Sequence, residues 1–135
     1  MSVASIMSAF NLSLSTFASS KGVTVAYENV PFTPPSDTPY LRSHLLPADT
    51  VAAACGPEAY NRHRGFFQVE AVYPIDDGWG DCAAMAEDIR KHFKRGTTLS
   101  SNIIVENSSA LPGFRDEGRY VIPVRVVYRA DISND

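Results

Sequence analysis

The stretch Phe66–Phe93, FFQVEAVYPIDDGWGDCAAMAEDIRKHF, contains a strand pattern, a turn and a helix pattern in direct succession. Residues 66–73 alternate between two faces, as the side chains of a β-strand do. One face carries Phe67, Val69, Ala71 and Tyr73. We expect a central strand whose apolar face meets the core.

After the turn, apolar residues recur at steps of four, three and four, the spacing that lines one side of a helix. Acidic residues lie in the first half of this segment and basic residues in its last turns, which matches the helix dipole, and Gly96 is expected to end the helix. The apolar stripe consists of Cys82, Ala86, Ile89 and Phe93, widened by Met85.

The N-terminal third shows the same kinds of pattern, with the helix before the strands. Apolar residues at steps of three and four predict an amphipathic helix over residues 3–18, followed by a short strand over 23–27. Four prolines exclude regular structure from 29–39, and the apolar loop Val30–Pro39 is expected to pack on a surface of this chain or of another. A second strand is predicted over Tyr40–Leu46.

The C-terminal third predicts a short strand over Ile103–Glu106 and a long one over 120–130. Pro123 lies inside the long strand and lacks an N–H donor, so we expect an edge position or a bulge there. The order of elements predicts an α+β fold, with a mostly antiparallel sheet of about four to six strands and two helices packed on one face.

Composition bounds the class of protein. The 135 residues provide one domain, 1–135, and 44% hydrophobic with 20% charged residues is typical of a folded globular chain. Twelve Lys and Arg against fifteen Asp and Glu give a net charge of -3, which excludes a strongly basic nucleic-acid binder. The apolar runs are far shorter than the roughly 20 residues of a membrane-spanning helix. We therefore expect no membrane partner.

No motif in the chain predicts catalysis or metal binding. The segment Asp76–Asp81 holds three carboxylates, but their spacing is not that of a calcium loop, so it is interpreted as a turn and a helix start. The histidines and cysteines have no ligand or nucleophile spacing, although a pair such as Cys55 with His63 stays open because triads assemble in space. We expect no catalytic residue, no metal and no cofactor, and buried free thiols.

The segment Gly56–Arg64 is predicted to be a polar loop with a basic cluster. Its basic residues are Arg62, His63 and Arg64. Such a cluster is either a solvated loop or a patch that faces a polyanion or an acidic partner surface.

Several phrases together resemble a known family. They are the Pro-Phe-Thr-Pro loop and Pro-Tyr-Leu-Arg strand start within Pro31–Arg42, Gly65-Phe66-Phe67-Gln68-Val69, Tyr73-Pro74, Ile89-Arg90-Lys91-His92-Phe93, Arg95-Gly96-Thr97 and Val121-Ile122-Pro123-Val124. From about Val3 to Tyr128 the chain resembles the tail terminator-like proteins of long, non-contractile-tailed bacteriophages.

This resemblance implies a virion protein without enzymatic activity that is assembled in the host cytoplasm. It would form a homo-oligomeric ring of six copies on the head-proximal end of the tail tube, stop tube polymerisation and offer its other face to the head-tail connector protein. DNA would pass through the lumen without specific binding, which a net charge of -3 suits. Two alternatives stay open: a head-completion or connector protein, and a small-molecule-binding α+β module or minor hydrolase.

The candidate interface residues come from the proline loop, the charged segments and the closing strand. The segments Arg62–Arg64 and Asp76–Asp81 have opposite signs, so they either mark different faces of the subunit or pair across a subunit interface. The candidates for subunit or tube contacts are Phe32, Tyr40, Arg42, Arg62, Arg64, Asp76, Asp77 and Arg125.

Overall fold

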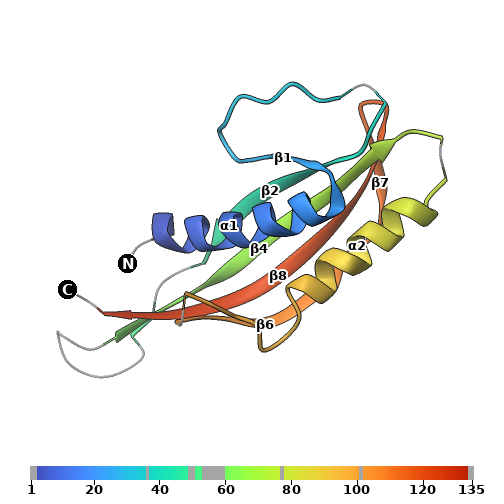
Figure 1. Cartoon of the computed structure of the whole chain (residues 1–135). Coiled ribbons are helices and arrows are strands. Elements are labelled where there is room, and N and C mark those ends of the chain that lie inside the picture. Colours follow the sequence, from blue (N-terminus) through green and yellow to red (C-terminus); the bar gives the residue numbers. More distant parts are fainter. Residues whose placement is uncertain are drawn as a thin grey trace.

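Two helices lie across one face of a long, twisted sheet in the computed structural model of the chain (Figure 1). The structure describes residues 3–35, 37–48, 51–52, 60–76, 78–100 and 102–133. The helices are α1 (Val3–Lys21) and α2 (Gly80–His92). The strands are β1 (Thr24–Ala26), β2 (Tyr40–Pro47), β3 (Val51–Ala52), β4 (Tyr60–Pro74), β5 (Thr98–Leu99), β6 (Ile103–Ala110), β7 (Phe114–Asp116) and β8 (Arg119–Ser133).

The sheet is built around the two longest strands. Its order is β1-β2-β4-β8-β6-β5, with β3 added to β4 and β7 added to β8, and every pairing except β1 with β2 is antiparallel. Strands β4 and β8 each have 15 residues and pair over their whole length. At about 3.4 Å per residue this pair extends roughly 50 Å. The predicted α+β fold, with its mostly antiparallel sheet and both helices on one face, is confirmed.

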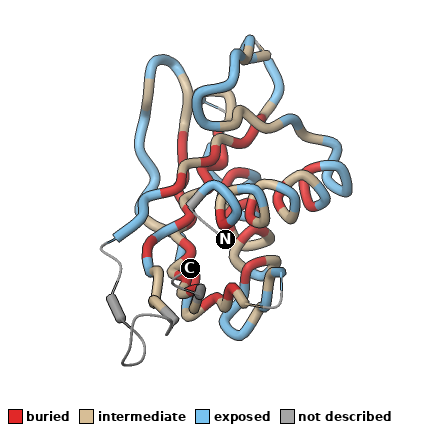
Figure 2. The backbone as a smooth tube through the Cα atoms, turned by 90° about the vertical axis from the view of Figure 1, so that its left-hand side faces the viewer, coloured by how far each residue is buried: buried red, intermediate tan, exposed pale blue. Residues whose placement is uncertain are grey.

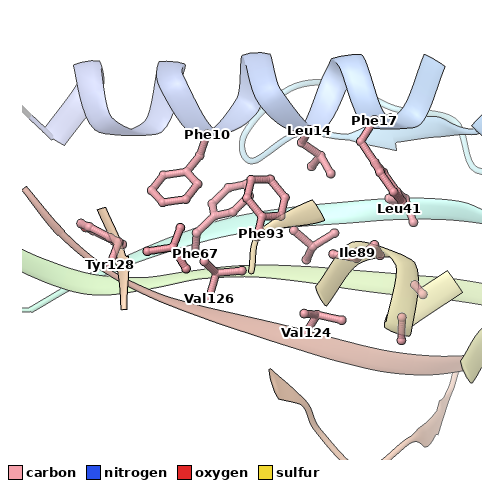
Figure 3. Close-up of a cluster of buried hydrophobic side chains, with 14 of the residues drawn as sticks. Phe10, Leu14, Phe17, Leu41, Phe67, Ile89, Phe93, Val124, Val126 and Tyr128 are labelled. Carbon is pink, nitrogen blue, oxygen red and sulfur yellow. The ribbon is translucent and has the colours of Figure 1, made fainter. Parts of the chain in front are cut away.

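The core fills the space between the helices and the inner face of the sheet (Figure 3). Phe10 of α1 stacks on Phe67 of β4 at 4.6 Å between ring centroids, and Phe93 and Tyr128 surround this pair. Figure 2 shows buried residues recurring along both helices and the strands, whereas the connecting loops are mostly exposed. The predicted apolar stripes of both helices and the predicted inner face of β4 are therefore confirmed.

The end of α2 differs from the prediction. The helix ends at His92, and the N–H of Phe93 still donates to the carbonyl of Ile89 at 3.1 Å. Gly96 lies beyond the helix with a φ of 88°, and its N–H donates to Val105 O at 2.9 Å. This glycine therefore turns the chain toward β5 and β6, a conformation with positive φ that glycine adopts at low cost.

The position predicted for Pro123 is wrong. Strand β8 lies inside the sheet, with β4 on one side and β6 and β7 on the other, and its register against β4 has no bulge. The carbonyl of Pro123 accepts from the N–H of Leu111, which follows β6. In an antiparallel sheet the backbone N and O of one residue point to the same neighbouring strand. The nitrogen of Pro123, which has no hydrogen to donate, therefore faces the gap between β6 and β7. The proline therefore removes no ladder bond to β4.

The predicted polar loop Gly56–Arg64 is also wrong where the structure describes it. Residues 60–64 belong to β4 and pair with 129–133 of β8. The sequence hides this part of the strand because residues 61–64 are all polar and their partners lie far along the chain, in β8. Strand β6 is also longer than predicted and reaches Ala110. Its polar second half is held in place where Ser108 is buried beside α2 and donates to Arg90 O at 3.0 Å.

Candidate assembly surfaces

The face of the sheet opposite the helices, called here the outer face, carries most of the predicted interface residues. Even-numbered residues of β2 and β4 and odd-numbered residues of β8 point to this side, because the core-facing residues hold the other positions. Along the sheet the outer face divides into an end covered by a loop, a charged middle and an end with no cover among the described residues.

The proline loop covers the first end. Phe32 packs on Tyr40 with ring centroids 5.1 Å apart, and Arg119 lies 5.4 Å above the Tyr40 ring. The Arg119 guanidinium also donates to the carbonyls of Thr38, at 3.3 Å, and Pro35. The loop therefore packs on its own chain. Tyr40 is only 6% exposed, so it has little surface to offer a partner in this conformation.

Arg42 lies in the charged middle and is paired within the chain. Its guanidinium lies 3.1 Å from Glu70 Oε1 and 3.3 Å from Asp116 Oδ2. The ring of His44 adds a contact of 3.1 Å to the same Glu70 oxygen. The Glu70 carboxylate is nearly buried, and these neighbours compensate the cost of burying its charge.

Arg62 forms the best-defined ion pair at the far end. Its Nε donates to Asp131 Oδ1 at 2.8 Å and its Nη2 to Oδ2 at 3.1 Å, a bidentate pair between directly opposed residues of β4 and β8. The hydrogen bond from Arg62 holds the pKa of Asp131 below its ordinary value, and the same bond raises the pKa of Arg62. Arg62 is therefore engaged in holding this end of the sheet together.

Three further arginines leave this end positively charged. Arg64 and Arg129 are direct cross-strand partners, and the ion pair that Arg64 forms among the described residues is a long one, 3.9 Å from the Glu106 carboxylate. Arg125 donates to Gln68 Oε1 at 3.2 Å. The three charges therefore exceed the carboxylates paired with them here, which leaves a cationic surface.

An apolar row crosses the sheet between these arginines. Leu46, Phe66 and Val127 are neighbours in register on β2, β4 and β8, and Leu46 and Phe66 are 46% and 36% exposed. Arg125 lies 4.9 Å above the Phe66 ring, in a cation–π contact. The sequence analysis missed this row. The sequence feature that could have indicated it is an aromatic residue, Phe66, on the polar face of the predicted strand.

The acidic turn lies beyond the other end of β4. The Asp76 carboxylate is 3.3 Å from Arg115 in a well-exposed pair, whereas Asp77 lies outside the described residues. Between this turn and α2 stands Trp79, which is 70% exposed, followed by the exposed Asp81. We call Asp76, Trp79 and Asp81 the Trp79 tip. Sequence reasoning missed Trp79, although a tryptophan between two glycines in a polar turn is a visible signal.

The two charged segments do not meet within one chain. Arg64 lies ten residues before the end of β4 at Pro74, or about 34 Å at 3.4 Å per residue, and Asp76 lies in the turn beyond that end. Within the subunit they mark opposite ends, and pairing across a subunit interface stays a prediction. The other predicted interface residues remain predictions in the same way.

The remaining chemistry of the chain is structural. Burial raises the pKa of the Cys82 thiol to about 11, and its Sγ lies 3.4 Å from Ala71 O, so this thiol is inert at neutral pH. Cys55 lies outside the described residues. No three His, Cys, Asp or Glu among the described residues gather as metal ligands do. In that same part of the chain neither helix has the length and apolarity needed to cross a membrane.

A family model now identifies the class of protein. The model described as phage tail terminator protein matches residues 5–128. The chain belongs to the phage tail terminator family. It is therefore a structural protein of a phage-type tail, and its location is the virion.

Solved structures share the fold of this tail terminator family member. A chain of unstated function is 28% identical, with a TM-score of 0.76, and the match covers 98% of this chain and 96% of that one. A chain in the virion of a native gene transfer agent particle is 23% identical with a TM-score of 0.55, covering 94% and 93%. That second likeness concerns the fold alone. A search of curated proteins finds no match.

Proposed function

We propose that this protein closes the head-proximal end of the tail tube as a ring of six identical copies, stops tube polymerisation and provides the surface that joins the head-tail connector. Membership of the terminator family supports this role. The protein acts by binding alone, without catalysis and without a cofactor.

The observation that carries this proposal is the contrast between the exposed surface of α1 and the outer face of the sheet. The exposed side of α1 has no charged residue before Lys21 at its end, and it presents Leu12 together with small and hydroxyl side chains. The outer face of the sheet instead carries arginines and carboxylates. A terminator needs two such different surfaces, because one must bind the last ring of the tube and the other must not bind a further tube subunit.

Size argues for several copies. A single domain of 135 residues is too small to surround a channel that passes DNA, so a capping role requires a closed ring. Head-to-tail contacts close such a ring when two different surfaces of each copy meet. DNA moves through the lumen without being held, in keeping with a net charge of -3.

Binding to isolated tail tubes tests the proposal and separates it from a head-completion role. We expect purified protein to be found by electron microscopy at one end of each tube, and not on heads that lack tails. Binding to the head portal with no binding to tube ends would favour the head-completion or connector alternative instead.

A further inference from the structure

We propose that the subunits join head to tail through one specific contact, in which the Trp79 tip of one copy docks on the apolar row of the next. This inference rests on the ring in the proposed function and names the surfaces that build it. The occupant of the apolar row is a second copy of this chain.

The receiving surface is a patch on β2, β4 and β8 that no described residue covers. The proline loop packs on the outer face near Tyr40, whereas Phe66 and Leu46 lie farther along the sheet and are exposed. The apolar row therefore exposes hydrophobic surface to solvent. A partner that covers this surface removes it from water, which favours binding.

The arginines around the row are arranged for an acidic partner. Arg64 and Arg129 oppose each other across β4 and β8, and like charges at directly opposed positions destabilise a sheet. Carboxylates from another molecule that approach these guanidinium groups relieve the repulsion.

The Trp79 tip has the matching chemistry. A tryptophan that is 70% exposed is rare on a stable surface, and tryptophan is enriched among the residues that dominate the energy of protein interfaces. Asp76 and Asp81 flank it and are both exposed, and Arg115 pairs with Asp76 at 3.3 Å, which leaves the carboxylate of Asp81 as the net negative charge of the tip. The tip therefore offers an apolar anchor beside a negative charge to an apolar row between positive charges.

The placement of the two surfaces fits a ring. The Trp79 tip follows the C-terminal end of β4 and begins α2, which lies on the helix side of the sheet (Figure 1). The apolar row instead crosses the outer face near the middle of β4. A contact between two different patches is heterologous, and such a contact builds a ring when the rotation that repeats it closes. Arginines also attract nucleic acid, but contacts with a phosphate backbone are electrostatic and would not bury the apolar row.

Two single variants and their mixture test the contact. The variants are Trp79→Ala, which removes the anchor, and Phe66→Glu, which places a charge in the row. Native mass measurements at several concentrations, alone and with tail tubes, are expected to show self-association at least about thirty-fold weaker for each variant than for the wild type. Lys94→Ala is the control, because it truncates an exposed side chain just beyond α2 that belongs to neither surface, and it should associate like the wild type. Thermal melting verifies that each variant is folded.

The mixture is decisive because each variant keeps the surface that the other has lost. Equal amounts of Trp79→Ala and Phe66→Glu are expected to form one-to-one dimers and nothing larger. Folded variants that form the wild-type oligomer would overturn the contact while leaving the ring intact, and so would two monomeric variants that ignore each other. Loss of DNA-oligonucleotide binding in Arg64→Glu, with normal oligomers in Trp79→Ala, would assign the row to nucleic acid. A wild-type protein that stays monomeric both in solution and on tubes would instead contradict the ring itself.

Discussion

At the scale of single residues, burial decides what the chemically reactive groups do. Cys82 is a soft nucleophile by type, but its side chain lies against the core and its pKa is raised to about 11. Arg42 and Arg62 are cations by type, yet both are held in ion pairs within the chain. The residues left to meet partners are large apolar side chains that stay exposed, chiefly Trp79 and Phe66.

Cys82 gives a prediction about alkaline pH. Its pKa rises from 9.0 to about 11 on folding, so the folded state holds the thiol proton more tightly than the unfolded state does. The contribution of Cys82 to the free energy of unfolding is therefore full below pH 9 and is lost as the pH rises toward 11. We expect a loss of about 2 kcal/mol over that range.

Denaturant unfolding of the wild type and of Cys82→Ala from pH 8 to pH 11 measures this contribution. The difference between the two proteins removes the parallel titration of Tyr128, whose pKa is raised by burial. The pKa of Tyr73 is raised by burial and also by the neighbouring Cys82, so part of its shift belongs to the contribution that is measured. The difference should shrink as the pH rises. A constant difference would show that the thiol does not titrate with folding.

At the scale of elements, α1 is stabilised by its packing and not by its surface. Phe10 is fully buried and stacks on Phe67, whereas Leu12 on the same helix is exposed. Phe10→Ala is expected to lower the free energy of unfolding by about 3–5 kcal/mol, and Leu12→Ala by less than about 0.5 kcal/mol. Chemical denaturation of both variants measures the contrast. Similar losses in the two would mean that α1 does not pack on the sheet as described.

The helices and the core faces were predictable because their signal is local. The stripe from Cys82 to Phe93 and the alternation in 66–73 repeat within a few residues, so the sequence alone indicates which side is buried. The extension of β4 through 60–64 was not predictable in this way. It depends on pairing with 129–133, whose polar residues supply partners such as Asp131.

The apolar row was beyond sequence reasoning for the same reason. Leu46, Phe66 and Val127 come from three strands and become neighbours only through the register of the sheet. The prediction for Pro123 was wrong because the cost of its missing N–H depends on which strand lies opposite it. Here the nitrogen faces the gap between β6 and β7, where no strand needs the donor. Candidate sites within one segment could be named from the sequence, whereas a site spread over several strands could not.

At the scale of the whole molecule, the central claim is that this domain ends a tube. Its family is that of the phage tail terminators, and the exposed surface of α1 differs in charge from the outer face of the sheet. These features predict a protein that binds a growing tube at one end and leaves that end unable to add subunits.

Assembly of tail tubes from purified tube protein, with and without this protein, tests that claim most directly. Added during growth, the protein should give shorter tubes, each with a ring at one end, and their length should fall as its concentration rises. Tubes that keep growing at the same rate to the same length, with no ring at either end, would contradict the account.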